Sequence, residues 1–164
     1  MSFTVCAIKH PSLFAIVDGN NFFVSCERVF NPSLNNKPVI VLSSNDGCAI
    51  ARSNEAKALG ITMCAPLHTF SHLIKPHGIK TLSCNFELYG DLSNRMMQIL
   101  QKFTSAVDVY SVDEAFLDIS RLPINDYAHF AQSIYETILK YIGIPTTIGV
   151  NSRAIMHQGS VVHS

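Results

Sequence analysis

The sequence predicts an α+β fold built on one antiparallel sheet, and three observations support this prediction. Short β-rich apolar runs alternate with two long amphipathic segments. Two of the runs are separated by only a few polar residues, which is typical of a hairpin. The strand-like runs are residues 14–17, 107–110, 115–119 and 146–150. Their order, β-α then β-β-α-β, favours a ferredoxin-like sheet with helices on one face, and an open α/β sheet remains an alternative.

The first run, FAIV at residues 14–17, is typical of a buried strand that ends in a single carboxylate, Asp18. Asn20 or Asn21 can then cap a helix that continues to about Phe30. The NPSLNNKP stretch that follows ends this helix.

The middle of the chain predicts smaller elements. Runs at residues 39–42 and 48–51 flank the turn-like SSNDG, so a hairpin is the simplest connection. Ser53 or Asn54 caps a short helix that stops at Gly60, and a second short helix is expected between Pro66 and Pro76.

The last third contains the strongest periodicity. A strand is expected at residues 79–82, and an amphipathic helix begins at Asn85. Asp126 is expected to cap another helix. The apolar face predicted for that helix consists of Tyr127, Phe130, Ile134, Ile138 and Tyr141.

Composition limits the possible functions. The 164 residues are 48% apolar and are enough for one domain or part of a larger one. Twelve Lys and Arg balance twelve Asp and Glu, so the chain has no excess charge to attract a polyanion or an anionic membrane. No run of eighteen apolar residues occurs, and we therefore expect a cytoplasmic protein with no membrane partner.

Three carboxylates are the first candidates for chemistry: Asp18, Asp113 and Glu114 each end or interrupt an apolar strand. In a ferredoxin-like sheet the strand before Asp18 neighbours the hairpin that carries the other two. Clustered carboxylates repel one another unless a divalent cation such as Mg²⁺ neutralises them. The alternative is ordinary structure, with Asp18 as a turn or cap residue and the Asp-Glu pair in a solvated turn.

Three longer stretches carry a resemblance to a known family. FAIVDGNNFFVSCERVFNPSLNNKPVIVLSSNDGCAIARSNEAKALGI, SCNFELYGDLSNRM and VDVYSVDEAFLDIS resemble the Y-family translesion DNA polymerases. They are most similar to the UmuC type, the catalytic subunit of bacterial DNA polymerase V. The resemblance covers about residues 12–150, in order and at the family's spacing.

The resemblance implies a site with two Mg²⁺ ions. Asp18 matches the family's first metal-binding aspartate, and Gly19 matches the position whose backbone carbonyl also binds metal. Asp113 and Glu114 match the second acidic motif, Ser-x-Asp-Glu-Ala. The implied metal ligands are therefore Asp18, Gly19, Asp113 and Glu114. The three carboxylates among them are the implied catalytic residues.

The resemblance also implies nucleotide contacts. Phe23 matches the aromatic steric gate that excludes the 2′-hydroxyl of a ribonucleotide, and Phe22 beside it is expected in the core. Arg52 and Lys57 are candidates for the triphosphate, with simple solvation as their alternative. Many relatives carry Tyr where Asn54 stands, so no nucleotide contact is assigned to Asn54.

The implied fold is a ferredoxin-like polymerase palm with an inserted small fingers subdomain, incomplete at its C-terminal end. The palm is expected at residues 12–30 and about 79–150, and the fingers at about 31–78. Residues 151–164 are expected to be a divergent tail. The thumb and little finger, and a triphosphate-binding Lys after residue 150, have no counterpart in the sequence.

The implied function is error-prone synthesis past DNA damage in the SOS response, by two-metal deoxynucleotidyl transfer. The expected partners are a primed, damaged DNA template and deoxynucleoside triphosphates, together with a UmuD-like subunit and a recombinase filament. The alternative is a catalytically inert fragment that at most binds or competes for the partners of such a polymerase.

Overall fold

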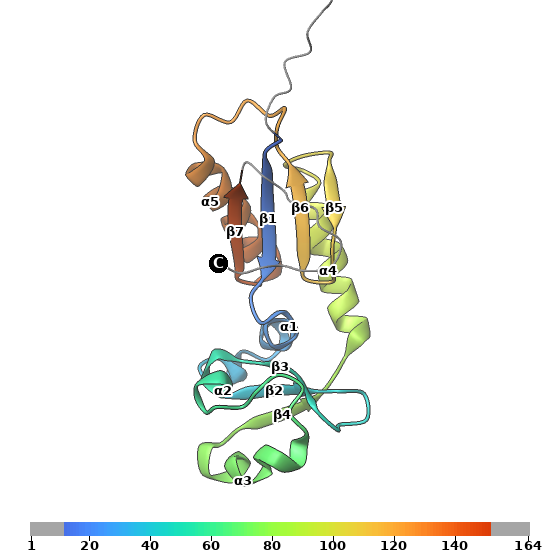
Figure 1. The fold of residues 1–164 in the computed structure, drawn as a ribbon, viewed down its shortest axis with the longest axis vertical. Helices are drawn as coiled ribbons and strands as arrows, with labels where there is room; N and C mark the ends of the chain where they lie inside the picture. The colour runs from blue at the N-terminus through green and yellow to red at the C-terminus, as the bar shows by residue number, and fades with distance from the viewer. Residues whose placement is uncertain (1–11, 152–164) are drawn as a thin grey trace, which may run out of the picture.

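The computed structural model describes residues 12–151, which form two sheets joined by a helix (Figure 1). The larger sheet has the order β5-β6-β1-β7, and every neighbouring pair in it is antiparallel. Its strands are β1 (Phe14–Gly19), β5 (Val107–Val109), β6 (Glu114–Asp118) and β7 (Thr146–Asn151). This is the strand order of a ferredoxin-like sheet, and the predicted fold class is confirmed.

Two long helices, α4 (Phe86–Leu100) and α5 (Tyr127–Ile142), cover one face of this sheet. Both begin as the sequence predicts. The side chain of Asn85 accepts a hydrogen bond from the backbone N–H of Leu88, and that of Asp126 accepts one from His129. The alternate residues of β1 and β6 that face the helices are fully buried: Ala15, Val17, Ala115 and Leu117.

The buried face of α5 differs from the prediction. Ile134, Ile138 and Ile142 are buried, whereas Tyr127 is 44% exposed and Tyr141 is 70% exposed. Ile142 lies four residues after Ile138 and therefore continues the buried stripe, which leaves Tyr141 beside it in solvent.

The smaller sheet has the order β3-β2-β4, with β2 at Val39–Leu42, β3 at Ala49–Arg52 and β4 at Lys80–Ser83. Strands β2 and β3 form the predicted antiparallel hairpin. Helix α2 (Asn54–Ala58) begins at Ser53, whose side chain accepts a hydrogen bond from the N–H of Ala56. A 3₁₀ turn, η1 (Pro32–Leu34), precedes β2.

Strand β4 belongs to the smaller sheet. The resemblance assigns residues from about 79 onward to the palm, whereas Lys80–Ser83 pairs in parallel with β2 of the smaller sheet. A parallel pair needs a long crossover, which α2 and α3 (Leu67–His77) supply between β3 and β4. Pro76, expected beyond α3, lies inside its last turn, and the helix ends at Gly78 with φ 62°.

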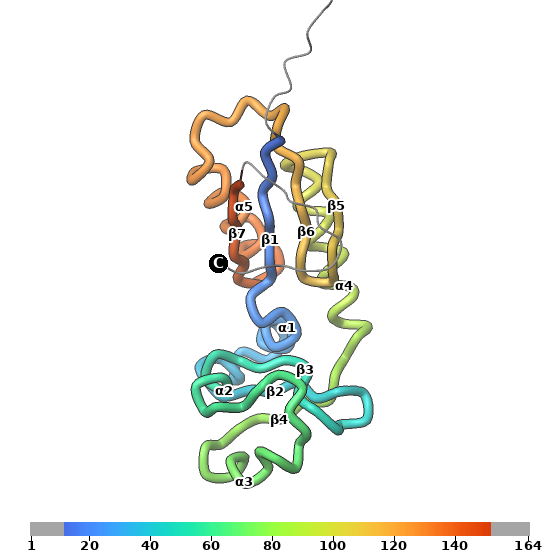
Figure 2. Tube along the Cα trace, viewed as in Figure 1, coloured from blue at the N-terminus to red at the C-terminus, as the bar shows by residue number. Residues whose placement is uncertain are grey.

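Helix α1 (Phe22–Phe30) lies between the two sheets and contacts elements of both halves, namely β2, β3 and α4. Figure 2 follows the chain from β1 through α1 into the smaller sheet, and back along β4 and α4. The tail expected at residues 151–164 lies outside the described residues except for Asn151, the last residue of β7. Within residues 12–151 no helix has the length and apolar character needed to cross a membrane.

Candidate active site

A cleft of about 750 Å³ lies between the end of β1 and the first part of α1 on one side and β3 with α2 on the other. Six of the seven predicted site residues line it: Asp18, Gly19, Phe23, Arg52, Lys57 and Asp113. The remaining lining residues are Asn20, Asn21, Phe22, Ile50, Ala51, Asn54 and Met63. The fold therefore brings together residues that are almost one hundred positions apart in the sequence.

Asp18 and Asp113 form the acidic side of the cleft. Asp18 is at the end of β1, and the N–H of the next residue, Gly19, donates to the backbone carbonyl of Asp113 at 2.8 Å. The side chain of Asp113 accepts a hydrogen bond from the Ser111 hydroxyl at 2.6 Å. Partial burial, and then the negative charge of Asp113, raise the pKa of Asp18, while the Lys57 ammonium acts in the opposite direction.

Glu114 takes a different position. It is the first residue of β6 and is the direct partner of Asp18 across the β1–β6 pair. Directly opposed residues of an antiparallel pair project from the same face of the sheet. Glu114 does not line the cleft, however, and among residues 12–151 no three His, Cys, Asp or Glu side chains are arranged to hold a metal ion together. The structure thus places Asp18 and Asp113 on one cleft and pairs Glu114 with Asp18 through the backbone, and a metal site shared by the three carboxylates stays a prediction.

The chemistry of the acidic side nevertheless suits a divalent cation. The negative charge of Asp113 contributes to the raised pKa of Asp18, and a cation bound in the cleft would offset that repulsion. Carboxylate oxygens are the ligands that Mg²⁺ prefers. Glu114 is already paired with Asp18 across β1 and β6, so no change of strand register is needed to place the two residues side by side.

Phe22 and Phe23 open α1, and only the first is in the core. Phe22 is buried, as predicted. Phe23 is partly buried, lines the cleft and stacks on Tyr89 of α4, with ring centroids 4.5 Å apart and 15° between the planes. Phe23 therefore presents an aromatic ring at the cleft while its other side is packed against α4.

Arg52 and Lys57 form the basic side. One guanidinium nitrogen of Arg52, Nη1, donates to the carbonyl of Ile61, whereas its Nε is buried and has no hydrogen-bond partner in the structure. The ammonium of Lys57 donates to the side-chain oxygen of Asn21 at 2.6 Å. Both cations lie opposite Asp18 and Asp113, so the cleft has walls of opposite charge.

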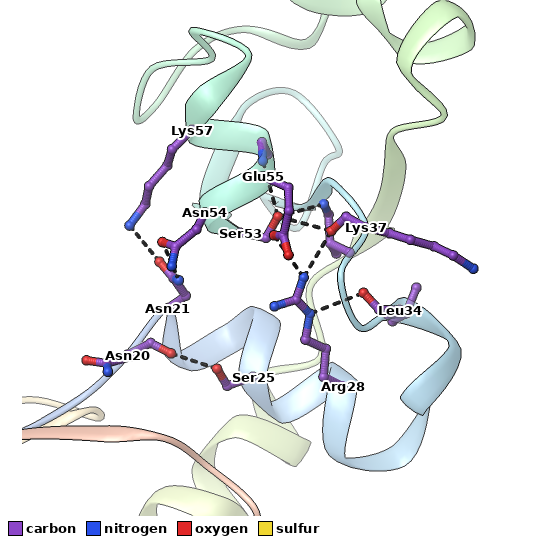
Figure 3. A network of polar contacts seen from close by, with 12 residues as sticks. Asn20, Asn21, Ser25, Arg28, Leu34, Lys37, Ser53, Asn54, Glu55 and Lys57 are labelled. Carbon is purple, nitrogen blue, oxygen red and sulfur yellow. Dashed lines mark hydrogen bonds and ion pairs between the residues drawn. The ribbon is translucent and has the colours of Figure 1, made fainter.

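Asparagines join the two walls, and the sequence analysis did not assign them to the site. Asn21 was expected as a helix cap, but its side chain makes no capping bond. Its amide nitrogen donates to the Asn54 side chain at 3.0 Å, and Figure 3 shows Asn54 and Lys57 both directed at it from α2. Asn21 has φ 47°, a left-handed conformation that Asn adopts more readily than most residues. The sequence did contain a signal for such contacts, because Asn20 and Asn21 directly follow the Asp-Gly at the end of a predicted strand.

A second set of contacts fixes α1 to α2 behind the cleft. Arg28 of α1 forms an ion pair with Glu55 of α2 at 3.0 Å and donates to the carbonyls of Leu34 and Lys37 (Figure 3). These three acceptors come from different segments. The guanidinium therefore holds α1, the loop before β2 and α2 in one arrangement.

The fold is that of the Y-family DNA polymerases. A structure titled as a ternary complex of Dbh and the crystal structure of DinB from Sulfolobus solfataricus each match with a TM-score of 0.79 and 28% sequence identity. Each match covers 88% of this chain and 43% of the other.

The chain belongs to the impB/mucB/samB family, whose model matches residues 17–156. It is 42% identical to protein UmuC of Salmonella typhimurium over 139 residues, which are 84% of this chain and 33% of the relative. MucB of Escherichia coli is 40% identical over the same length, with the same shares covered. DNA polymerase IV of Bacillus velezensis is 30% identical over 138 residues, 82% of this chain and 33% of that protein. The resemblance expected from the motifs is confirmed, and the chain spans about a third of the length of these curated relatives.

Proposed function

We propose that this chain carries the nucleotide-binding and catalytic centre of a DNA polymerase that copies damaged templates. One observation supports this above the others: a single cleft is lined by Asp18, Asp113 and Phe23 and, from β3 and α2, by Arg52 and Lys57. Triphosphate transfer needs cations at the phosphates and carboxylates where metal ions are held. The family relationship makes the reaction deoxynucleotidyl transfer directed by a template.

In this proposal Asp18, Asp113 and Glu114 hold two Mg²⁺ ions, with the backbone carbonyl of Gly19 as a further ligand. When bound, the ions would lower the pKa of the primer hydroxyl and stabilise charge on the transferred phosphate. The hydrogen bond between Gly19 and Asp113 holds the ends of β1 and of the β5–β6 turn together before any ligand binds. Positioning of this kind reduces the reorganisation needed for transfer.

The basic wall is proposed to bind the triphosphate. Arg52 lines the cleft and is held in place by the hydrogen bond from its Nη1 to the carbonyl of Ile61, and a guanidinium is well suited to bind phosphate oxygens. The Lys57 ammonium has three N–H donors and gives one of them to the side-chain oxygen of Asn21, so it can bind a phosphate oxygen while that hydrogen bond is kept.

Phe23 is proposed to select the sugar. Phe23 lines the same cleft as the carboxylates and the cations. In this proposal the ribose of a bound nucleotide lies against the Phe23 ring, which would exclude a 2′-hydroxyl.

The proposed function also assigns the two sheets to polymerase subdomains and the reaction to a biological setting. The four-stranded sheet with α4 and α5 corresponds to the expected palm, and the smaller sheet with α2 and α3 to the fingers. Error-prone synthesis in the SOS response, a primed template, a UmuD-like subunit, a recombinase filament and a cytoplasmic location all follow from the family relationship as parts of this proposal.

Nucleotide binding by the full 164-residue chain tests the proposal. Isothermal titration with a deoxynucleoside triphosphate should show binding that depends on Mg²⁺. Asp113→Asn should weaken the Mg²⁺ dependence, and Lys57→Met should reduce triphosphate affinity by about fivefold to tenfold, as expected for loss of one charge-assisted contact. Glu136→Gln and Lys102→Met, both on exposed positions far from the cleft, are the matched controls.

Two results would contradict this assignment. One is the absence of Mg²⁺-dependent nucleotide binding, which would favour the inert-fragment alternative. The other is equal loss in the cleft variants and their controls, which would place binding elsewhere on the chain.

A further inference from the structure

Phe23 and Glu27 lie four residues apart on α1, and both contact the same side chain, Tyr89 of α4. The Tyr89 ring stacks on Phe23, and its hydroxyl donates to the Glu27 carboxylate with 2.8 Å between Oη and Oε1. Residues at this spacing share one face of a helix, so a single tyrosine can contact both. Tyr89 is thereby held at two points, through its ring and through its hydroxyl.

Tyr89 is deeply buried, with 1% of its surface exposed. A buried hydroxyl without a partner is destabilising, and Glu27 is the acceptor that satisfies this one. Burial, with a further contribution from Glu27, raises the pKa of the Tyr89 hydroxyl, so it remains a donor throughout the neutral range. The direction of this hydrogen bond is therefore fixed.

The other aromatic neighbours of Phe23 meet its ring only edge to face. Phe22 of α1, which is buried, lies at a centroid distance of 6.2 Å. Phe86, the first residue of α4, meets both Phe23 and Tyr89 edge to face, at 6.0 and 6.1 Å, and is itself 57% exposed. Among the described residues Tyr89 is thus the ring that stacks face to face on Phe23, and the hydroxyl of Tyr89 is held by Glu27.

We propose that Glu27 is a positioning residue for sugar selection, acting on Phe23 through Tyr89. The proposal rests on the proposed function, because Phe23 selects a sugar only if the cleft binds a nucleoside triphosphate. Exclusion of one hydroxyl requires the ring to be held to within about 0.5 Å. Loss of the Glu27 contact frees Tyr89 to shift and lets the Phe23 ring move away from the sugar.

The test measures the ratio of the dissociation constants for a ribonucleoside and a deoxyribonucleoside triphosphate, in Mg²⁺, on the full chain. Glu27→Met and Tyr89→Phe should each reduce this ratio by about tenfold, the lower end of the range for one hydrogen bond to a charged acceptor. The double variant should reduce it no further, because both changes remove the same contact. Glu27→Gln retains an acceptor oxygen and should preserve the ratio. Glu136→Met on α5 removes an exposed carboxylate and is the matched control.

Each outcome bears on one of the two proposals. A general loss of stability would weaken both nucleotides equally and leave the ratio unchanged, which would overturn the role of Glu27. A ratio that collapses in Phe23→Ala but is unaffected in Glu27→Met would also overturn it, while the proposed function stands. If Phe23→Ala leaves the ratio unchanged, or the wild-type chain binds neither nucleotide, the proposed function fails and the role of Glu27 fails with it.

Discussion

The backbone N–H of Gly19 donates a hydrogen bond to the carbonyl oxygen of Asp113 at 2.8 Å. This bond closes the end of the β1–β6 pair and joins two acidic segments that are distant in the sequence. It holds Asp18 and Asp113 on one wall of the cleft, where their like charges repel. Four measurable properties of the chain test this site and the packing around it.

The first prediction concerns the pH dependence of stability. The pKa of Asp18 is raised above its ordinary value of 3.8 by partial burial and by Asp113. The folded chain therefore binds this proton more tightly than the unfolded chain, so the contribution of Asp18 to stability is present below pH 3.8 and is lost as the pH rises through the raised pKa. In Asp18→Asn the side chain does not titrate, so the folded chain does not lose this stability as the pH rises. Its stability relative to wild type, measured by urea unfolding, should increase from about pH 3.5 to about pH 7.

Two variants of neighbouring residues give opposite shifts and serve as controls. Asp113→Asn removes a negative charge and should lower the pKa of Asp18, whereas Lys57→Met removes a positive charge and should raise it further. An NMR titration of the Asp18 carboxyl carbon measures both. Shifts of the same sign in the two variants would show that Asp18 does not sense these charges.

The second prediction concerns Arg28, which joins α1 to α2. Its guanidinium pairs with Glu55 and donates to two carbonyls in a partly buried setting. Arg28→Met should lower the free energy of unfolding by about 1.5–3 kcal/mol, because charge-assisted bonds in such surroundings are stronger than surface pairs. The control is Arg95→Met, which breaks an exposed pair with Asp91 and should change stability by less than about 1 kcal/mol. Equal losses in the two variants would contradict the structural role of Arg28.

The third prediction concerns Gly19. A Cβ at this position would lie 2.7 Å from Cδ2 of the Phe22 ring, and Phe22 is buried and cannot move freely. Gly19→Ala should therefore destabilise the chain by about 1–3 kcal/mol through overpacking. At Gly149 of β7 an added Cβ meets nothing within 4 Å, so Gly149→Ala should be neutral or slightly stabilising. Thermal unfolding of both variants is followed by circular dichroism. Destabilisation of Gly19→Ala alone would support the close approach to Phe22, whereas destabilisation of both variants would indicate a general requirement for glycine in these strands.

The fourth prediction concerns the packing of α5 on the larger sheet. Ile138 has no exposed surface, whereas 40% of Leu139 is exposed. Ile138→Ala should lower the free energy of unfolding by about 2–5 kcal/mol because it leaves a cavity beneath the sheet. Leu139→Ala should cost clearly less, since much of its side chain is already in water. Denaturant unfolding of the pair measures the difference, and similar losses would mean that α5 presents a different face to the sheet.

The sequence by itself determined which segments form strands and helices. The apolar runs that became β1, β2, β3, β6 and β7 alternate or are continuously apolar, and the caps at Ser53, Asn85 and Asp126 are local hydrogen bonds within a few residues. The Asp-Gly at the end of β1 and the Ser-Val-Asp-Glu that leads into β6 singled out Asp18 and Asp113, because carboxylates at the ends of apolar strands are unusual. These features depend on neighbours in the sequence and are visible without the fold.

Only the tertiary structure decided which of these segments pair and which side chains meet. The sequence pattern of residues 80–83 is compatible with a strand in either sheet. Their pairing with β2 depends on the crossover through α2 and α3. Asn21 can cap a helix by type, but contact with Asn54 and Lys57 directs its side chain across the cleft instead. Tyr141 lies at the margin of an apolar stripe, and the sheet covers Ile142 in its place. Each outcome depends on atoms brought together from distant parts of the chain, and periodicity and local hydrogen bonding contain no information about such contacts.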